Sequence, residues 1–262
     1  MGRQRIISFD IDMTLLDHKD FQIPPSAMEA IQKIKEKGDI VVLATGRNLE
    51  NSVSRDVVRM VDPQALIQLN GTKVTAGEQV LFEHFFDKAL LKELIEFVKK
   101  KDYALGISMD DTHYFFRQDI VDYYDQKRWG KAFRSYSDPE QIINLPIRTL
   151  TFVGEPEQAR DIEAHFPQIK LAMFAGLYGA DVMEQVSSKA NGLRVLCRHF
   201  GVDIQDTVAF GDSMNDREIL EAAGLGIAMG NSIESLFPYA DYITDDIGED
   251  GVYNACVKFG LI

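Results

Sequence analysis

The sequence is short of basic residues, and this shortage excludes whole classes of partner. Its 262 residues carry 28 Lys and Arg against 41 Asp and Glu, which gives a formal net charge of −13. A surface with this excess of carboxylates repels polyphosphates and anionic lipids, and no strongly basic patch offsets it. We therefore expect no nucleic acid and no membrane among the partners of this chain.

Long apolar runs and cysteines are also scarce. The longest apolar stretches, such as residues 40–44, are far shorter than the roughly 20 residues that a membrane-spanning helix needs. The basic N-terminus runs straight into a strand-like segment without the apolar core of a signal peptide, which predicts a cytoplasmic location. The only two cysteines, Cys197 and Cys256, lack metal-ligand spacing, so we interpret them as small buried apolar residues. The five histidines show no ligand spacing either and receive no role.

Strands and helices alternate at both ends of the chain, and this alternation predicts a parallel sheet covered by helices. At the N-terminal end, apolar runs predict strands and helical spacings predict helices, in the order strand 5–9, helix 26–37, strand 39–44, helix 48–60 and strand 65–69. At the C-terminal end, the expected order is helix 189–200, strand 207–210, helix 215–222, strand 224–228, strand 242–244 and helix 248–259.

The pattern changes between these two parts of the chain. Asn70-Gly71 is a turn signal that leads into a hairpin. After it come helices mixed with short strands, including a pair around Asp110-Asp111, which is typical of an α+β insertion. The insertion also concentrates aromatic and arginine side chains, which we interpret as core and solvated surface, with a substrate pocket as the alternative: Tyr114, Phe115, Phe116, Tyr123, Tyr124, Trp129, Arg117, Arg128 and Arg134.

Polar side chains gather at the carboxyl ends of the predicted strands, where open parallel sheets bind their ligands. Strand by strand they are Asp10 and Asp12, then Thr45-Gly46-Arg47, then Asn70-Gly71, and finally Asp212 to Asp216, with Lys189 opening a helix nearby. This order would bring carboxylates, a hydroxyl and an ammonium group to one edge of the sheet.

Taken alone, each motif has an ordinary structural interpretation. Asp10 and Asp12 could begin a calcium loop, but an EF-hand needs Gly and Glu where this chain has Leu15 and Phe21. Thr45-Gly46-Arg47 could be a turn at a strand end, and a lone lysine at a helix start is usually solvated. It is the order of these motifs along the chain that argues against the ordinary structural interpretations.

Four segments in order resemble the motifs of the haloacid dehalogenase-like hydrolases. They are Phe9-Asp10-Ile11-Asp12-Met13-Thr14-Leu15, Ala44-Thr45-Gly46-Arg47, Lys189, and Gly211-Asp212-Ser213-Met214-Asn215-Asp216. The resemblance covers essentially the whole chain. An α/β insert between the second and third motifs resembles the Cof-type (subclass IIB) sugar-phosphatase-like enzymes.

This resemblance implies a fold and an activity. The expected fold class is α/β, a Rossmann-like parallel-sheet core of residues 1–82 and 184–262 with an inserted α+β cap domain at 83–183. The cap is expected to close over the sheet edge and exclude bulk water. The implied function is Mg²⁺-dependent hydrolysis of a small phosphate monoester, a sugar phosphate first among them, through an aspartyl-phosphate intermediate.

The resemblance also implies roles for single residues. Asp10 is expected to be the nucleophile and a metal ligand, and Asp12 the general acid/base, with its backbone carbonyl on the metal. Asp212 would complete the metal ligands, and Asp216 would hold a metal-bound water or a neighbouring lysine. The remaining residues are expected to bind the phosphate (Ile11, Thr45, Gly46, Lys189 and Asn215) or to contact the substrate beyond it (Arg47 and Asn70).

One departure from the family pattern leaves alternatives open. Met13 stands where many members have Gly, and its bulk beside the flap after the first strand could narrow the choice of leaving group. This departure motivates the alternative of a non-catalytic sugar-phosphate-binding module, and the family's phosphoryl-transferring relatives supply a second alternative, a hexose phosphomutase. The sequence leaves open the oligomeric state and the preference for Mg²⁺ over Mn²⁺.

Overall fold

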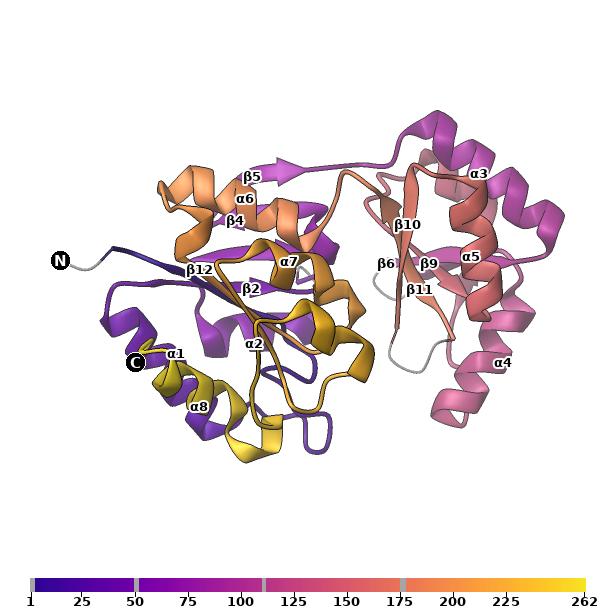
Figure 1. Cartoon of the computed structure of the whole chain (residues 1–262). Helices are drawn as coiled ribbons and strands as arrows, with labels where there is room; N and C mark the ends of the chain where they lie inside the picture. The colour runs from indigo at the N-terminus through magenta and orange to yellow at the C-terminus, as the bar shows by residue number, and fades with distance from the viewer. Residues whose placement is uncertain (1–2, 50–51, 110–111, 175–177) are drawn as a thin grey trace. The chain divides into compact units, whose positions relative to one another are not determined.

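A computed structural model describes residues 3–49, 52–109, 112–174 and 178–262, and its chain divides into two compact units (Figure 1). The first unit joins Met1–Glu83 to Ser187–Ile262, and the second unit comprises His84–Val186. The expected turn at Asp110-Asp111 lies outside the described residues. Within the described ranges, no helix is both long and apolar enough to cross a membrane.

The first unit is built on a sheet with β1 at its centre and the strand order β14-β13-β12-β1-β2-β3-β4-β5. Strands β14 to β3 run parallel, and the hairpin β4–β5 continues the sheet in antiparallel fashion. The strands are β1 (Ile6–Phe9), β2 (Ile40–Ala44), β3 (Ala65–Gln68), β4 (Lys73–Ala76), β5 (Gln79–Glu83), β12 (Thr207–Gly211), β13 (Leu225–Ala228) and β14 (Tyr242–Ile243).

Helices cover both faces of this sheet. On one face, α1 (Pro25–Glu36), α2 (Ser52–Val61) and α8 (Gly251–Lys258) contribute to one apolar cluster. On the other, α6 (Lys189–Phe200) and α7 (Arg217–Ala222) contribute to a second. Because both faces are covered, every residue of β1, β2 and β12 is buried, which explains why these strands appear in the sequence as short, almost continuous apolar runs.

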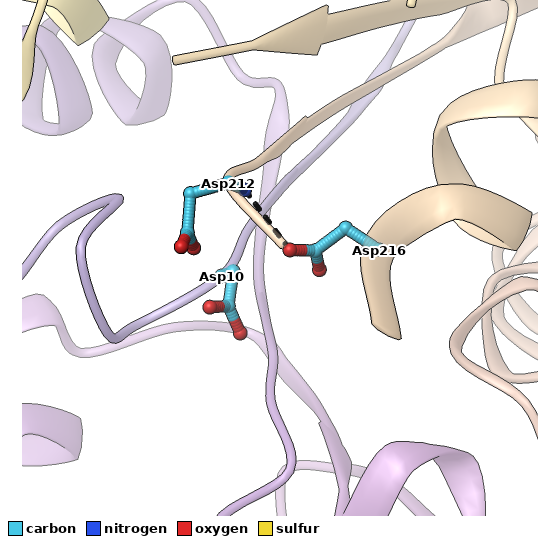
Figure 2. A group of neighbouring side chains, drawn as sticks. All are labelled: Asp10, Asp212 and Asp216. Atoms are coloured by element: carbon cyan, nitrogen blue, oxygen red, sulfur yellow. Dashed lines mark hydrogen bonds between the residues drawn. The ribbon is translucent and has the colours of Figure 1, made fainter. Parts of the chain in front are cut away.

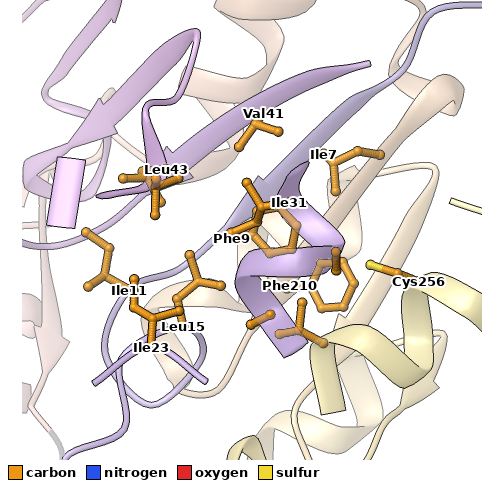
Figure 3. Close-up of a cluster of buried hydrophobic side chains, with 14 of the residues drawn as sticks. Ile7, Phe9, Ile11, Leu15, Ile23, Ile31, Val41, Leu43, Phe210 and Cys256 are labelled. Atoms are coloured by element: carbon orange, nitrogen blue, oxygen red, sulfur yellow. The ribbon is translucent and has the colours of Figure 1, made fainter. Parts of the chain in front are cut away.

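Aromatic stacking anchors the middle of the sheet. The rings of Phe9 on β1 and Phe210 on β12 stack with their centroids 4.9 Å apart, and Ile31 of α1 and Cys256 of α8 lie in the same cluster (Figure 3). Cys197 and Cys256 are both buried thiols, so the interpretation of the cysteines as buried residues is confirmed.

The second unit has its own sheet and core. Its strand order is β10-β11-β9-β6-β7-β8, and all neighbours are antiparallel except β7 and β8. The strands are β6 (Ala104–Met109), β7 (Thr112–Phe115), β8 (Tyr136–Ser137), β9 (Leu150–Val153), β10 (Ile169–Met173) and β11 (Ala180–Glu184). Helices α3 (Lys88–Lys101) and α5 (Pro156–His165) contribute to its main apolar cluster, and α4 (Gln118–Trp129) to a smaller one.

The expected fold class is confirmed: a parallel-sheet α/β core carries an inserted α+β unit. The strand β8 was not predicted, since its two residues are too few to show an alternating pattern. Short 3-10 helices connect the larger elements, namely η1 (Leu69–Gly71), η2 (Pro139–Asn144), η3 (Ile204–Asp206), η4 (Met214–Asp216), η5 (Glu234–Tyr239) and η6 (Ile247–Glu249).

Candidate active site

Asp10 lies at the carboxyl end of the central strand, because β1 ends at Phe9 and the next residue still belongs to the sheet edge. Its backbone N–H donates to the carbonyl of Phe210 at 3.1 Å, which continues the pairing of β1 with β12 by one residue. The side chain is buried, with only 4% of the residue exposed. A carboxylate is thereby fixed at the middle of the edge where parallel sheets bind ligands.

Lys189 joins this carboxylate to a second one. Its Nζ donates to Asp10 Oδ1 at 2.7 Å and to Asp216 Oδ1 at 2.6 Å, and its side chain is completely buried. Burial alone would lower the pKa of Lys189, but the two carboxylates outweigh burial and raise it, so the ammonium stays charged. Lys189 reaches this position because it opens α6, whose N-cap Ser188 accepts a hydrogen bond from the backbone N–H of Asn191.

Asp216 uses both of its oxygens to hold other parts of the site. While Oδ1 accepts from Lys189, Oδ2 accepts from the backbone N–H groups of Asp212 at 3.0 Å and Ser213 at 3.2 Å. This close approach requires a glycine at position 211, since a Cβ on Gly211 would lie 2.4 Å from the Cβ of Asp216. Asp216 is therefore placed to fix the loop after β12 and the ammonium group together.

Asp212 points toward Asp10 and forms with it the part of the site suited to a cation (Figure 2). One carboxylate oxygen from each of Asp10, Asp212 and Asp216 lies within 4.8 Å of the others. Asp212 Oδ1 accepts from the hydroxyl of Thr14 at 3.2 Å. Burial, reinforced by the neighbouring carboxylates, raises the pKa of Asp212 and of Asp10 well above the usual range of an aspartate.

Such a pair of buried oxygen ligands fits a hard divalent cation, because Mg²⁺ prefers carboxylate oxygens and its charge removes the penalty for burying them ionised. Asp10 and Asp212 are the better-placed ligands. Both oxygens of Asp216 already accept hydrogen bonds, so we expect Asp216 to position Lys189 and the loop after β12 and not to bind the cation directly.

Asp12 lies in a different environment from Asp10. Its Oδ2 accepts from Arg47 Nε at 2.7 Å and its Oδ1 from Arg47 Nη2 at 2.5 Å, and His18 Nε2 lies 2.6 Å from Oδ1. Although burial by itself would raise the pKa of Asp12, Arg47 and His18 lower it below its usual value. In this structure Asp12 is therefore an ionised carboxylate held between two side chains.

His18 is the residue of this site that the sequence did not single out. It is brought to Asp12 by the flap after β1, which folds back on itself through pairing of Asp12 with Leu16 and of Asp17 with Gln22. No periodicity or ligand spacing marks such a contact. A histidine six residues after the carboxylate in a short flap is the one signal that could have suggested it.

The remaining site residues form a connected set at the ends of β2, β3 and β12. Thr45 Oγ1 accepts from the backbone N–H of Arg47 at 3.1 Å, and the Thr45 carbonyl accepts from the N–H of Asn70 at 3.0 Å. The side chain of Asn215 donates to that of Asn70 at 3.2 Å and accepts from Ser213 at 2.7 Å. Ile11 and Gly46 flank Asp10 and Thr45, and their roles as N–H donors to a phosphate remain predictions.

Met13 has a strained backbone. Its φ is 58°, in the left-handed region that a side chain with a Cβ adopts at a cost. Its carbonyl accepts a hydrogen bond from Asn231 at 2.8 Å and its N–H donates to Leu16 at 2.9 Å. The departure noted in the sequence therefore falls at a position whose backbone favours glycine.

Comparison with known proteins shows the family of this chain. A family model described as haloacid dehalogenase-like hydrolase matches residues 7–256. A Bacillus subtilis (strain 168) protein named "Putative phosphatase YkrA" is 27% identical over 261 residues, which are 98% of each chain. An HMP-PP phosphatase of Cronobacter sakazakii is 27% identical over 240 residues, 88% of this chain and 86% of that one.

A solved structure extends the likeness to the whole fold. The subclass IIB sugar phosphatase BT4131 superposes with a TM-score of 0.86 at 26% identity, covering 99% of this chain and 100% of that one. Both units of the present chain therefore have counterparts in a single related enzyme.

Proposed function

The chain is a phosphatase of the haloacid dehalogenase-like hydrolase family, and from this premise we propose that it hydrolyses small phosphate monoesters in a Mg²⁺-dependent reaction through an aspartyl-phosphate on Asp10. The observation that carries the proposal is the buried carboxylate of Asp10, which lies at the end of β1 with Lys189 on one oxygen and Asp212 close by. We propose sugar phosphates as the first substrate class, supported by the likeness to a sugar phosphatase.

Asp10 and Asp212 would hold the metal ion with their side chains, and Asp12 with its backbone carbonyl. When bound, Mg²⁺ lowers the repulsion between a phosphate and a carboxylate and stabilises charge on the transferring phosphoryl oxygens. Lys189 contributes a fixed positive charge next to Asp10. The phosphate would also accept hydrogen bonds from Thr45, from Asn215 and from the N–H groups of Ile11 and Gly46.

In the first step, an oxygen of Asp10 attacks phosphorus, the bond to the leaving alcohol breaks, and Asp12 supplies the proton that this alcohol takes up. In the second step, Asp12 takes a proton from water, which attacks phosphorus and restores the Asp10 carboxylate. Two easier displacements thereby replace one difficult hydrolysis.

The contacts of Asp12 suggest how its proton is controlled. Arg47 holds Asp12 as a carboxylate, which is the form needed in the second step. To protonate a leaving group, Asp12 must first take up a proton, and this requires that part of its pairing with Arg47 is broken. We propose that Arg47 breaks this pairing when its side chain turns to the substrate. Arg47 therefore has a second role beside the substrate contact expected from the sequence. The cap is proposed to supply the remaining substrate contacts and to exclude water.

The test is phosphate release from a panel of sugar and nucleotide phosphates with Mg²⁺ or EDTA, for the wild type and Asp10→Asn. We expect turnover that needs the metal and is lost in Asp10→Asn, whose amide keeps the shape of the carboxylate but cannot form the phosphoenzyme. Asp12→Asn should lower the rate about 10²–10⁴-fold with the fold intact.

Other outcomes would favour the alternatives. Isomerised sugar phosphate without net phosphate release would indicate a phosphomutase. Binding of a substrate without any turnover, in wild type and variant alike, would indicate a binding module. Mn²⁺ in place of Mg²⁺ in the same assay decides the metal preference.

A further inference from the structure

The second unit contains a cavity of about 460 Å³ that the proposed chemistry does not use. Its volume falls in the range of small-molecule sites, roughly 300–1,000 Å³. The walls come from α4, from the segment that follows it and from the neighbourhood of β9, and five of the lining side chains are aromatic: Tyr124, Trp129, Phe133, Phe174 and Tyr178. An aromatic lining of this density offers several ring faces to a ligand.

Two of these rings are held in place by contacts within the wall. The hydroxyl of Tyr124 donates to Glu155 at 2.7 Å, and its ring stacks with that of Tyr178 at a centroid distance of 5.2 Å. Even so, Trp129, Phe133 and Tyr178 stay 57%, 53% and 43% exposed. Large aromatic side chains left this open around one cavity are typical of a binding site.

A buried ion pair fixes another wall of the cavity. Asp125 is 6% exposed and accepts from Arg134 Nε at 2.6 Å and Nη2 at 3.1 Å. The guanidinium carbon of Arg134 lies 5.3 Å from the centre of the Phe133 ring. The bidentate pair with Asp125 therefore holds the guanidinium of Arg134 beside the Phe133 ring.

The cavity is also locally positive in an acidic chain. Three cations line it, Lys127, Arg128 and Arg134, against the single acid Asp125, although the whole chain carries a net charge of −13. Arg134 is neutralised by Asp125, whereas Lys127 and Arg128 form no salt bridge with a described residue, and the carboxylate of Glu155 acts on Lys127 from nearby. Each lies over a ring of the wall, Lys127 4.1 Å from the centre of Tyr178 and Arg128 4.8 Å from that of Trp129.

We propose that this cavity binds a planar aromatic anion, whose ring stacks on the exposed faces of Phe133 and Trp129 and whose negative charge lies against Lys127 and Arg128. Stacking is available to any flat heteroaromatic ring, and the two cations select a ring that carries an acidic group. Because Lys127 and Arg128 hold this charge, the ligand is a separate effector molecule and not the phosphate ester that reacts at Asp10.

Tryptophan fluorescence of the protein reports directly on this cavity, because the single tryptophan of the sequence is Trp129 in the cavity wall. We would titrate Asp10→Asn protein in EDTA with uridine 5′-monophosphate, uridine and ribose 5-phosphate, and follow tryptophan fluorescence. The expected result is saturable quenching by the nucleotide, weaker binding of uridine, and no quenching by ribose 5-phosphate. Equal quenching by the nucleotide and ribose 5-phosphate, or quenching by none of the three, would overturn the proposal.

Matched variants separate the cavity from the general surface. Phe133→Ala should weaken binding of the nucleotide about tenfold, since one lost stacking contact typically costs that much or more. Phe85→Ala is the control, because Phe85 is a similarly exposed residue of the same unit that does not line the cavity. Like Phe133, it lies close to an arginine: the guanidinium carbon of Arg148 is 5.0 Å from the centre of its ring. If Phe133→Ala proves misfolded by circular dichroism, Phe133→Leu replaces it, because leucine keeps an apolar side chain but offers no ring. Equal affinities in the cavity variant and in Phe85→Ala would refute the assignment.

Turnover by the active enzyme tests whether this ligand acts as an effector. We expect uridine to change the rate of ribose 5-phosphate hydrolysis in the wild type and not in Phe133→Ala. An unchanged rate in the wild type would overturn the assignment of an effector. Because binding is measured without metal or turnover, a failure of this proposal is distinct from a failure of the proposed hydrolysis.

Discussion

Lys189 is a fully buried ammonium between the carboxylates of Asp10 and Asp216, and each of the three groups depends on the others. A buried charge costs free energy unless it is paired and hydrogen-bonded. Here one cation serves two anions, so removing it leaves two carboxylates facing each other in a site with little water. Lys189 therefore stabilises the fold in addition to the role that we propose for it in catalysis.

Lys189→Met should destabilise the protein by about 3–5 kcal/mol, the usual cost of breaking a buried ion pair, and should abolish phosphate release. Urea unfolding at neutral pH measures the loss. Arg59→Met is the control, because Arg59 pairs with Asp56 on the exposed side of α2, and the expected change there is below about 1 kcal/mol. Equal losses in the two variants would contradict the interpretation.

At Met13 the backbone itself is the source of strain. With φ at 58°, replacing Met13 by glycine should relieve about 1–2 kcal/mol of steric cost, partly offset by the greater freedom of glycine in the unfolded chain. Met13→Ala loses the same side chain and keeps the strain. We expect thermal unfolding to rank the glycine variant above the alanine variant. The opposite order would mean that the φ value does not limit stability.

Between elements, the decisive contact is the approach of the turn after β3 to the start of α6. Gly71 has φ of +91°, and a Cβ there would lie 2.1 Å from the carbonyl oxygen of Ser188 and 3.0 Å from the backbone nitrogen of Lys189. The position tolerates no side chain because backbone meets backbone. The turn that contains Asn70 therefore packs backbone to backbone against the start of the helix that contains Lys189.

Gly71→Ala is expected to cost about 1–3 kcal/mol more than Gly77→Ala, because both glycines have positive φ but only Gly71 also meets backbone within 3 Å. Chemical unfolding of both variants gives the difference. The rate of phosphate release should fall in Gly71→Ala alone, since the clash displaces Lys189. Parallel behaviour of the two variants would exclude a role for this contact.

Some elements of the fold could be predicted from sequence patterns, and others could not. Strands β1, β2 and β12 are buried on both faces, so their short apolar runs predicted the sheet. The acids that directly follow β1 and β12 predicted the positions of Asp10 and Asp212. Contacts made by a folded-back flap leave no such pattern, which is why His18 was given no role. The exposed aromatic residues of α4 were interpreted as core for a related reason: sequence spacing alone does not distinguish a cavity wall from a packed interior.

In the molecule as a whole, two units carry separate hydrophobic cores, and the candidate metal ligands all belong to the first. A ligand stabilises the state that binds it according to its concentration relative to Kd, by about 2.7 kcal/mol at a hundredfold excess. The effect of metal should therefore differ between the units.

We expect Mg²⁺ to slow amide hydrogen exchange in peptides from β1 and β12 and to leave those from α3 and α5 unchanged. Asp212→Asn should lose this response. Without metal it should be no less stable than the wild type, because the amide removes a charge that burial penalises. Slower exchange in both units, or a response that survives in Asp212→Asn, would contradict the assignment of the ligands. Exchange measured by mass spectrometry resolves each peptide.

The charges around Asp10 also have a consequence for the valence of the ion that we propose to bind there. Its three aspartates share a single ammonium, so ionised they carry two negative charges that the group itself does not balance. A sodium ion would leave one of these charges uncompensated in a buried place, whereas a divalent ion cancels both. A trivalent lanthanide would reverse the sign and hold inorganic phosphate after hydrolysis. We therefore expect the charge of an ion to decide its binding here before its radius does. Lanthanides are expected to inhibit phosphate release, because they would hold the product in the site.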